Sequence, residues 1–177
     1  MSHAFLYSNG KMTDLGSFGG YESAGTGINA NGEVVGWSDM PDGVSRRAFL
    51  YSGGSMMDLG TLGGSSSEAT GINDRGQVVG SAFTGDFAMF GFPIRHAFLF
   101  SGGMMLDLGT LAGPMLQSSW ANGVNDAGEI VGDSDVGYWC NEYGCGSVVH
   151  AFLYSGGRMI DLGTLGGDYS AGTSINN

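Results

Sequence analysis

Short extended segments alternate with glycine-containing turns along the whole chain. In one stretch, residues 69–73 form a short extended run, and residues 74–76, Asp-Arg-Gly, predict a tight turn because Asp and Gly tolerate the positive φ that such turns need. The β-branched run 77–80 predicts a second strand, and residues 97–100 and 104–108 predict a third and a fourth. No segment repeats apolar residues with the helical period over ten or more positions, so we expect strands throughout.

The third strand of each unit carries information about packing. In Ala48-Phe49-Leu50-Tyr51, both alternating sets of side chains are apolar. A strand with one face in water alternates apolar and polar residues, so we expect sheets that are covered on both faces.

This four-strand unit is repeated. The Ala-Phe-Leu motif follows positions 3, 47, 96 and 150, with spacings of 44, 49 and 54 residues. In each copy an Asp-Leu-Gly follows at a constant offset, and an Ile-Asn or Val-Asn pair comes later. A period of this size is typical of repeat architectures, in which each unit buries its faces against its neighbours.

Small four-stranded sheets, covered on both faces and repeated at this period, predict an all-β fold, namely a β-propeller of about four blades. We expect a single domain over residues 1–177, with complete units at approximately 21–62, 65–111 and 116–165. A β-trefoil, with three four-stranded repeats, is the main alternative, and the fourth copy of the motif argues against it. An open solenoid is a third option.

The two ends of the chain hold parts of a further unit. Residues 1–20 contain two expected strands and residues 166–177 contain one, which together form a split fourth blade without its Val-Val-Gly strand. Joining the first and last strands in one blade closes a ring and removes exposed edges. The missing strand leaves three alternatives open: an incomplete blade, a propeller completed by another chain in an oligomer, and a piece of a longer array.

The repeated motifs resemble the HAF repeat, a family of predicted extracellular bacterial repeats. Residues 58–64, 69–73 and 76–80 fit its Asp-Leu-Gly-Thr-Leu-Gly-Gly, Ala-x-Gly-Ile-Asn and Gly-x-Val-Val-Gly motifs without a gap. The resemblance covers nearly the whole chain, with Arg47 in place of the leading His and residues 112–114, Ala-Gly-Pro, in place of Gly-Gly. It implies a propeller-like fold and an extracellular or cell-surface location, but no established activity and no catalytic residue.

Composition agrees with many short strands and excludes some partners. Glycine makes up 35 of the 177 residues, at fixed places that are typical of turns. Asp and Glu outnumber Lys and Arg by 17 to 6, and the net charge of −11 argues against nucleic acid and anionic membranes as partners. No apolar run approaches the ~20 residues of a membrane span, and we expect no signal peptide at this N-terminus.

Two cysteines lie close together in the third repeat. Cys140 and Cys145 are candidates for a disulfide that closes a small loop. A zinc site is less favoured, because a tetrahedral site would need two more ligands close by.

Two polar positions recur in the repeats, and we expect both to be part of the scaffold. His3, His96 and His150 share one repeat position with Arg47, which is not a metal ligand, so a hydrogen bond that anchors the strand is favoured over a ring of metal ligands. The Asn-x-x-Gly turns lack the alternating oxygen ligands and the terminal Glu of a calcium loop. They are expected to be hairpin turns, with a structural calcium ion as the less favoured alternative and no other cofactor. The Asp of each Asp-Leu-Gly is expected to accept backbone N–H groups of the following turn; these residues are Asp14, Asp58, Asp107 and Asp161.

The copies differ most between their second and third strands. In a propeller these loops emerge on one face, and repeat proteins place insertions on the binding face. Aromatic side chains near carboxylates suit stacking on sugars or contacts with a protein. The alternative is that they fill small cores of their own loops or a contact between subunits. The candidate ligand-binding residues are Trp37, Asp39, Phe87, Phe90, Asp133, Asp135, Tyr138, Trp139 and Tyr143.

We therefore expect a non-catalytic module that binds a glycan or a protein through variable aromatic and acidic loops. A structural unit that forms homo-oligomers is the first alternative. A hydrolase or lyase that uses Asp39, Asp133 and Asp135 is the second, and it ranks last because the sequence contains no nucleophile elbow, phosphate-binding glycine loop or His-Glu-x-x-His motif.

Overall fold

The protein is built from antiparallel β-strands. The computed structural model describes residues 1–88, 91–112, 118–141 and 144–177, and these residues form fourteen strands and no α-helix, which confirms the all-β prediction. The strands are β1 (Ala4–Ser8), β2 (Lys11–Gly16), β3 (Ser23–Ile28), β4 (Val34–Asp39), β5 (Arg46–Ser52), β6 (Ser55–Asp58), β7 (Ser67–Ile72), β8 (Val78–Phe87), β9 (Pro93–Ser101), β10 (Met104–Gly109), β11 (Ser119–Val124), β12 (Ile130–Asn141), β13 (Gly144–Ser155) and β14 (Arg158–Gly163).

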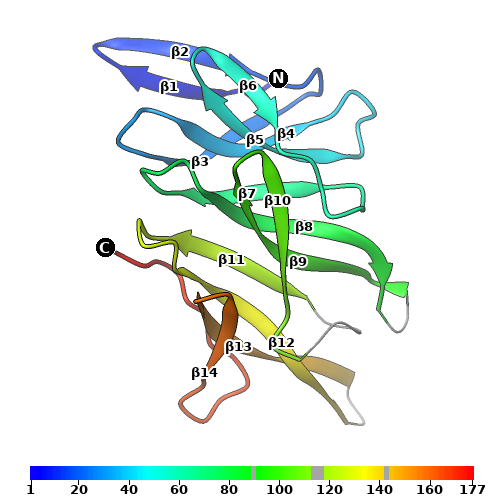
Figure 1. Ribbon diagram of the computed structural model, residues 1–177. Helices are drawn as coiled ribbons and strands as arrows, with labels where there is room; N and C mark the ends of the chain where they lie inside the picture. Colours follow the sequence, from blue (N-terminus) through cyan, green and yellow to red (C-terminus); the bar gives the residue numbers. More distant parts are fainter. Residues whose placement is uncertain (89–90, 113–117, 142–143) are drawn as a thin grey trace.

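The strands form one two-stranded sheet and three four-stranded sheets. β1 pairs with β2, and the three larger sheets contain β3 to β6, β7 to β10 and β11 to β14, each in the order of the sequence. Figure 1 shows these sheets stacked one after another, from the β1–β2 hairpin at the top to β14 at the bottom. Each four-stranded sheet is therefore one repeat; β3–β6 and β7–β10 have a sheet on either side, whereas β11–β14 contacts the β7–β10 sheet and the C-terminal segment.

The ends of the chain lie on different sheets. Among the described residues β1 and β2 have no third partner strand, whereas the C-terminal segment bonds to β12 and β13. The N–H of Ser170 donates to Val149 O at 2.9 Å, and the N–H of Gly172 donates to Gly132 O at 3.0 Å. The expected pairing of the first and last strands in one blade is therefore not seen (Figure 1). The last segment docks on the β11–β14 sheet through a parallel bridge, as β3 docks on the N-terminal hairpin, and that hairpin lies at the opposite end of the stack, out of reach of the last segment.

The third strand of the β7–β10 sheet is buried on both faces, as its apolar sequence predicts. In β9, Phe98 packs with Val35 against the preceding sheet, while its neighbour Leu99 packs with Phe152 against the following sheet. Successive residues of one strand thus enter two different cores, because side chains alternate between the faces of a sheet.

The glycine of each Val-Val-Gly motif lies where two strands approach closely. A Cβ on Gly80 would lie 2.0 Å from Glu68 O on β7. The equivalent Gly36 and Gly132 have the same constraint, because a Cβ on either of them would lie 1.9 Å from a carbonyl oxygen of the neighbouring strand. Only glycine fits between the first and third strands at this point, which explains why the motif ends with it.

Hydrogen bonds tie the first strands of successive sheets together. Thr26 Oγ1 donates to Ala69 O at 2.8 Å, and Thr70 Oγ1 donates to Ala121 O at 2.6 Å. In the turn after β7, the side-chain amide of Asn73 donates to Asn125 O, which lies in the equivalent turn after β11. These turns are hairpin turns, as predicted, and they join the sheets along one side of the stack.

Candidate functional site

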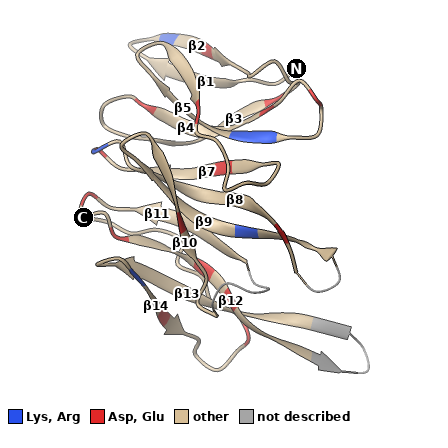
Figure 2. Ribbon diagram, turned by 45° about the vertical axis from the view of Figure 1, so that its right-hand side comes forward, with Lys and Arg blue, Asp and Glu red and all other residues tan. Residues whose placement is uncertain are grey.

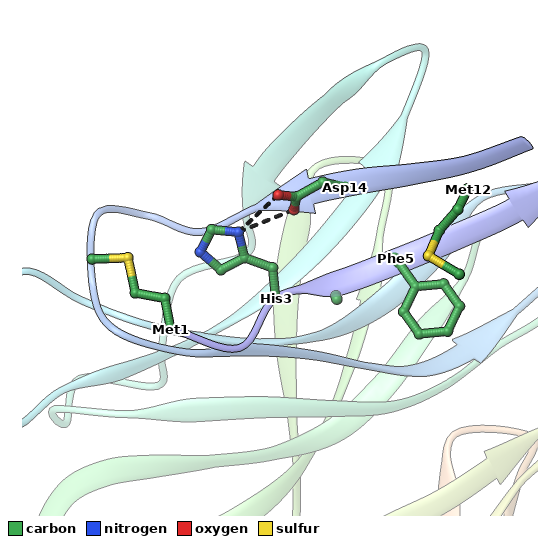
Figure 3. Close-up of a pocket in the computed structure, with 6 residues that line it drawn as sticks. Met1, His3, Phe5, Met12 and Asp14 are labelled. Carbon is green, nitrogen blue, oxygen red and sulfur yellow. Dashed lines mark hydrogen bonds and ion pairs between the residues drawn. The ribbon is translucent and has the colours of Figure 1, made fainter.

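The recurrent histidines pair with the recurrent aspartates of their own repeats. His3 Nδ1 lies 3.0 Å from Asp14 Oδ1, and the same pairing recurs in two other units. Asp14 Oδ1 also accepts the backbone N–H of Gly16 at 2.8 Å. Figure 3 shows the His3 ring facing the Asp14 carboxylate across β1 and β2. The other two pairs are His96 with Asp107 and His150 with Asp161, each at 2.9 Å.

Arginine replaces histidine in the remaining repeat and keeps the contact. Arg47 Nε lies 3.7 Å from Asp58 Oδ2, and Arg47 also donates to Ser65 O. Asp58 accepts the N–H of Gly60 at 2.8 Å, like its equivalents. The scaffold role that we predict for both positions is confirmed by these contacts.

The aspartates of the three His–Asp pairs have lowered pKa values. Burial raises the pKa of Asp107, but hydrogen bonds from His96 and from the Gly109 N–H outweigh it, so the pKa lies below its ordinary value. A carboxyl group with a lowered pKa stabilises the folded state at pH values above its ordinary, unfolded-state pKa. This stabilisation is lost as the pH falls through the folded-state pKa.

Replacing Asp107 with alanine is expected to lower the free energy of unfolding by about 1–2 kcal/mol at pH 7, because two hydrogen bonds to a charged group are lost. The difference from wild type should shrink as the pH falls below about 4, the ordinary pKa of a carboxyl group, and then through the lower pKa of the folded state. Urea unfolding at several pH values measures it. Asp86→Ala, an exposed carboxylate on β8, is the matched control and should change little at any pH. A pH-independent difference for Asp107→Ala would contradict the assigned role of the carboxylate.

A ladder of charged side chains links two of the sheets. Arg46 Nε lies 3.2 Å from Asp39 Oδ1, and its Nη1 lies 3.2 Å from Glu68 Oε1 on the next sheet. Glu68 Oε2 lies 3.6 Å from Arg95 Nη1, so Glu68 stands between two arginines. In Figure 2 the blue bands of β5 and β9 lie on either side of the red band of β7. We call Asp39, Arg46, Glu68 and Arg95 the charged ladder.

Aromatic rings flank the charged ladder. The Arg46 guanidinium lies over the Trp37 ring, 3.5 Å from its centroid, and that of Arg95 lies over Phe83 at 4.4 Å. Such stacking is a cation–π interaction that fixes both groups. Trp37 and Asp39, two of the predicted binding residues, are thus held in a contact between sheets, and one face of the Trp37 ring is covered.

The third four-stranded sheet has acidic residues without arginines at the corresponding place. Asp133 accepts a hydrogen bond from Asn122 Nδ2 at 2.9 Å, and the buried Asp135 accepts one from Ser118 N at 3.0 Å. Within the described part of the chain neither carboxylate forms a salt bridge, and Val149 holds the position of Arg46 and Arg95. Burial raises the pKa of Asp133, and the neighbouring Asp135 carboxylate adds to this. Burial also raises the pKa of Asp135.

Replacing Asp133 with asparagine is expected to stabilise the protein at pH 7, by up to about 1 kcal/mol, because a partly buried charge is removed while an oxygen remains for Asn122. A raised carboxyl pKa means that wild-type stability falls as the pH rises from about 4 through the folded-state pKa. The gain should therefore vanish at pH 3. Thermal unfolding at both pH values measures the effect, with Asp86→Asn as the control. Destabilisation at pH 7 would show that the charge of Asp133 is required for the fold.

Two of the three segments predicted as variable loops are extensions of hairpins, whereas the first is the short connection between β4 and β5. β8 continues to Phe87 and β9 begins at Pro93, while β12 and β13 remain paired as far as Asn141 and Gly144. In Figure 1 both hairpins project to the same side of the stack, at the right. Four aromatic side chains on these hairpins, between 43% and 68% exposed, are Phe87, Phe92, Tyr138 and Trp139.

The hairpin of β12 and β13 holds the densest group of predicted residues. Trp139 lies against Gly146, where a Cβ would approach its ring to 2.7 Å. Burial raises the pKa of the Tyr138 hydroxyl, and the nearby Asp135 carboxylate adds to this. The structure thus brings Asp133, Asp135, Tyr138 and Trp139 onto one hairpin. Phe90 and Tyr143 lie outside the described residues, as do the side chains of Cys140 and Cys145, so the disulfide remains a prediction.

Sequence reasoning missed Arg46, Glu68 and Arg95 as parts of this side of the molecule. The sequence does contain a signal for Arg46 and Arg95. They occupy the same repeat position, immediately before Arg47 and His96. Glu68 has no such signal, because the equivalent residues are Ala24 and Trp120.

No protein-family model, curated protein or solved structure matches this chain. Within the described ranges, no helix is long and apolar enough to cross a membrane. The same residues contain no group of three or more His, Cys, Asp or Glu side chains that could hold a metal ion.

Proposed function

We propose that this protein is a non-catalytic binding module, whose ligand is a glycan or the surface of another protein. The observation that carries the proposal is the projection of β8–β9 and β12–β13 to one side, with exposed aromatic side chains on both hairpins. Exposed aromatic rings on a rigid support bind sugars by stacking and proteins as anchor residues. Asp133, which is only partly buried, lies on one of these hairpins and carries a carboxylate that can accept hydrogen bonds.

The β-propeller is the arrangement of sheets that we propose for this module. Two observations support it: the β7–β10 sheet is covered on both faces, and the first strands of successive sheets are tied together, as at Thr26 and Ala69. In a propeller the first strands line the central axis. The resemblance to HAF repeats, with the extracellular or cell-surface location that it implies, belongs to the same proposal.

A glycan array with labelled protein tests the binding function. We expect wild type to bind a subset of glycans and Trp139→Ala to lose at least tenfold in affinity for them. Tyr7→Ala is the matched control, because Tyr7 is an exposed aromatic residue on β1, on the first sheet of the stack. Equal binding by wild type and Trp139→Ala would contradict a role for this hairpin, and an array without hits would direct the search to protein ligands.

A structural unit that assembles with its own copies is the second candidate. It is favoured by apolar side chains exposed on the last sheet: Leu162 is 56% exposed, whereas the equivalent Leu59 is 5% exposed. Sedimentation over a wide concentration range tests it, and a strict monomer at high concentration would exclude it.

A further inference from the structure

The first strand of the protein has a free edge. In the part of the chain that the structure describes, β1 pairs only with β2, whereas the equivalent strands β5, β9 and β13 each lie between two others. In β5, Ala48 O accepts a hydrogen bond from Leu59 N, on the side of β6, so the backbone groups of the next residue, Phe49, face β4. By the same alternation, the N–H and C=O groups of Phe5 and Tyr7 point away from β2. A strand edge of this kind pairs readily with an added strand.

Apolar side chains next to this edge are uncovered, although their equivalents are buried. Phe5 is 57% exposed, whereas Phe49, Phe98 and Phe152 are fully buried. Met12 is exposed too, and Figure 3 shows it beside Phe5 on the outer face of the hairpin.

A groove runs between the free edge and the next sheet. It has a volume of about 340 Å³ and is lined by Phe5, Leu6 and Tyr7 on one side and by residues 25–28 and Val34 on the other. At the next level of the stack the corresponding space is filled, because Val35 of β4 packs there with Ala69 and Val78. The groove therefore has the shape left by a missing pair of strands equivalent to β3 and β4.

We propose that this edge and groove bind a β-hairpin of the repeat's own kind, with a Gly-Ile-Asn strand, a tight turn and a Val-Val-Gly strand. The register follows from β4 and β5, where Val34 lies opposite Tyr51 and Gly36 lies opposite Phe49. The incoming strand places its first valine opposite Tyr7, its second opposite Leu6 and its glycine opposite Phe5.

The incoming glycine is a specificity element. In the third four-stranded sheet, a Cβ on Gly132 would lie 2.8 Å from the Phe152 ring, which rests across the neighbouring strand. Phe5 holds the repeat position of Phe152, so its ring requires a glycine opposite it in the same way. A larger residue in place of the incoming glycine would clash with the Phe5 ring and keep it from packing across the added strand.

A hairpin fits the site better than a second copy of this chain does. The C-terminal segment of a second copy offers an equivalent of β3, with Thr173 and Asn176, but this segment already bonds to β12 and β13 of its own copy. It would leave the edge of β1 and the Phe5 ring uncovered. The Val-Val-Gly strands inside a second copy are already paired on both edges.

A synthetic peptide of residues 64–82, which spans β7, its turn and the Val-Val-Gly of β8, is the direct probe. We expect saturable one-to-one binding to the full chain by fluorescence anisotropy, with slowed hydrogen exchange at the Phe5 and Tyr7 amides. The same peptide with Gly80→Val should bind at least tenfold more weakly, because the glycine is needed both opposite Glu68 O within the hairpin and opposite the Phe5 ring. On the protein, Tyr7→Pro removes the edge N–H and should weaken binding at least fivefold more than Tyr7→Ala, which keeps it.

A second arm removes the need for the free peptide to fold. The same segment is joined to Met1 by a flexible Gly-Ser linker, and we expect the thermal midpoint to rise and the Phe5 and Tyr7 amides to be protected. The proposal is overturned by no binding at millimolar peptide together with unprotected amides in the fusion. It is also overturned by equal binding of the Gly80→Val peptide, or by a dimer of the chain that the peptide does not dissociate, which would make a second copy the occupant.

Discussion

Replacing Phe98 with alanine is expected to lower the free energy of unfolding by about 3–5 kcal/mol, the range typical of a buried phenylalanine. Phe98 is fully buried in β9, in the core between two four-stranded sheets. Its removal leaves a cavity. The flanking valines and alanines cannot move to fill it, because their strands are held in place by hydrogen-bonded neighbours. Guanidinium unfolding, extrapolated to water, gives the difference.

The repeat supplies a control of the same residue type for this substitution. Phe5 occupies the position of Phe98 in the N-terminal hairpin but is 57% exposed, so Phe5→Ala should cost less than about 1 kcal/mol. The ratio between the two effects tests whether burial by the neighbouring sheets, rather than the motif itself, stabilises the fold. Similar losses for both variants would show that Phe5 is covered in solution.

Gly80→Ala is expected to destabilise the protein by about 3 kcal/mol or more, because its Cβ would lie 2.0 Å from Glu68 O. The clash is with backbone, so β7 and β8 must separate to relieve it. Gly137→Ala on β12 is the matched control, since a Cβ there meets nothing within 4 Å and Gly137 is also on the second strand of its sheet. It should change stability by at most about 0.5 kcal/mol, in either direction. Thermal or chemical unfolding of both variants measures the contrast, and equal effects would contradict the close approach of β7 and β8.

The strands and turns were predictable because their signals are local. The apolar residues at both alternating sets of positions in Ala-Phe-Leu-Tyr indicate two buried faces, and Asn-x-x-Gly indicates a hairpin turn. Neither signal depends on how the sheets are arranged. The scaffold role of the His and Asp positions was also predictable, since Arg47 at one of them is compatible with an anchoring contact and not with a metal ring. Repetition thus separates scaffold positions from variable ones within the sequence itself.

The arrangement between sheets was not predictable in the same way. The charged ladder joins Arg46 to Glu68, which lie on different sheets, and only the stacking of those sheets brings them together. That contact places Trp37 under a guanidinium, whereas the sequence alone made it a candidate for ligand binding. The hairpin extensions of β8 and β12 were expected as loops, because their sequences lack the β-branched alternation of the other strands, and cross-strand pairing overrides this weak local preference.

The position of the chain ends depends on the sheet to which the last segment bonds. Residues 168–172 bond to β12 and β13 rather than to the N-terminal hairpin. Sequence similarity between repeats cannot distinguish these sites, since every sheet offers the same kind of surface. The adjacent sheet is reached through a short connection, which lowers the entropy lost on docking.

Native-state hydrogen exchange of the wild-type chain tests the stacked arrangement with its free first edge most directly. Backbone amides that face a paired strand exchange only when the structure opens, whereas amides on a free edge exchange rapidly. We predict strong protection at Phe49, Phe98 and Phe152 and little protection at Phe5 and Tyr7. Protection of Phe5 equal to that of Phe98 would contradict the account, because β1 would then be paired on both of its edges.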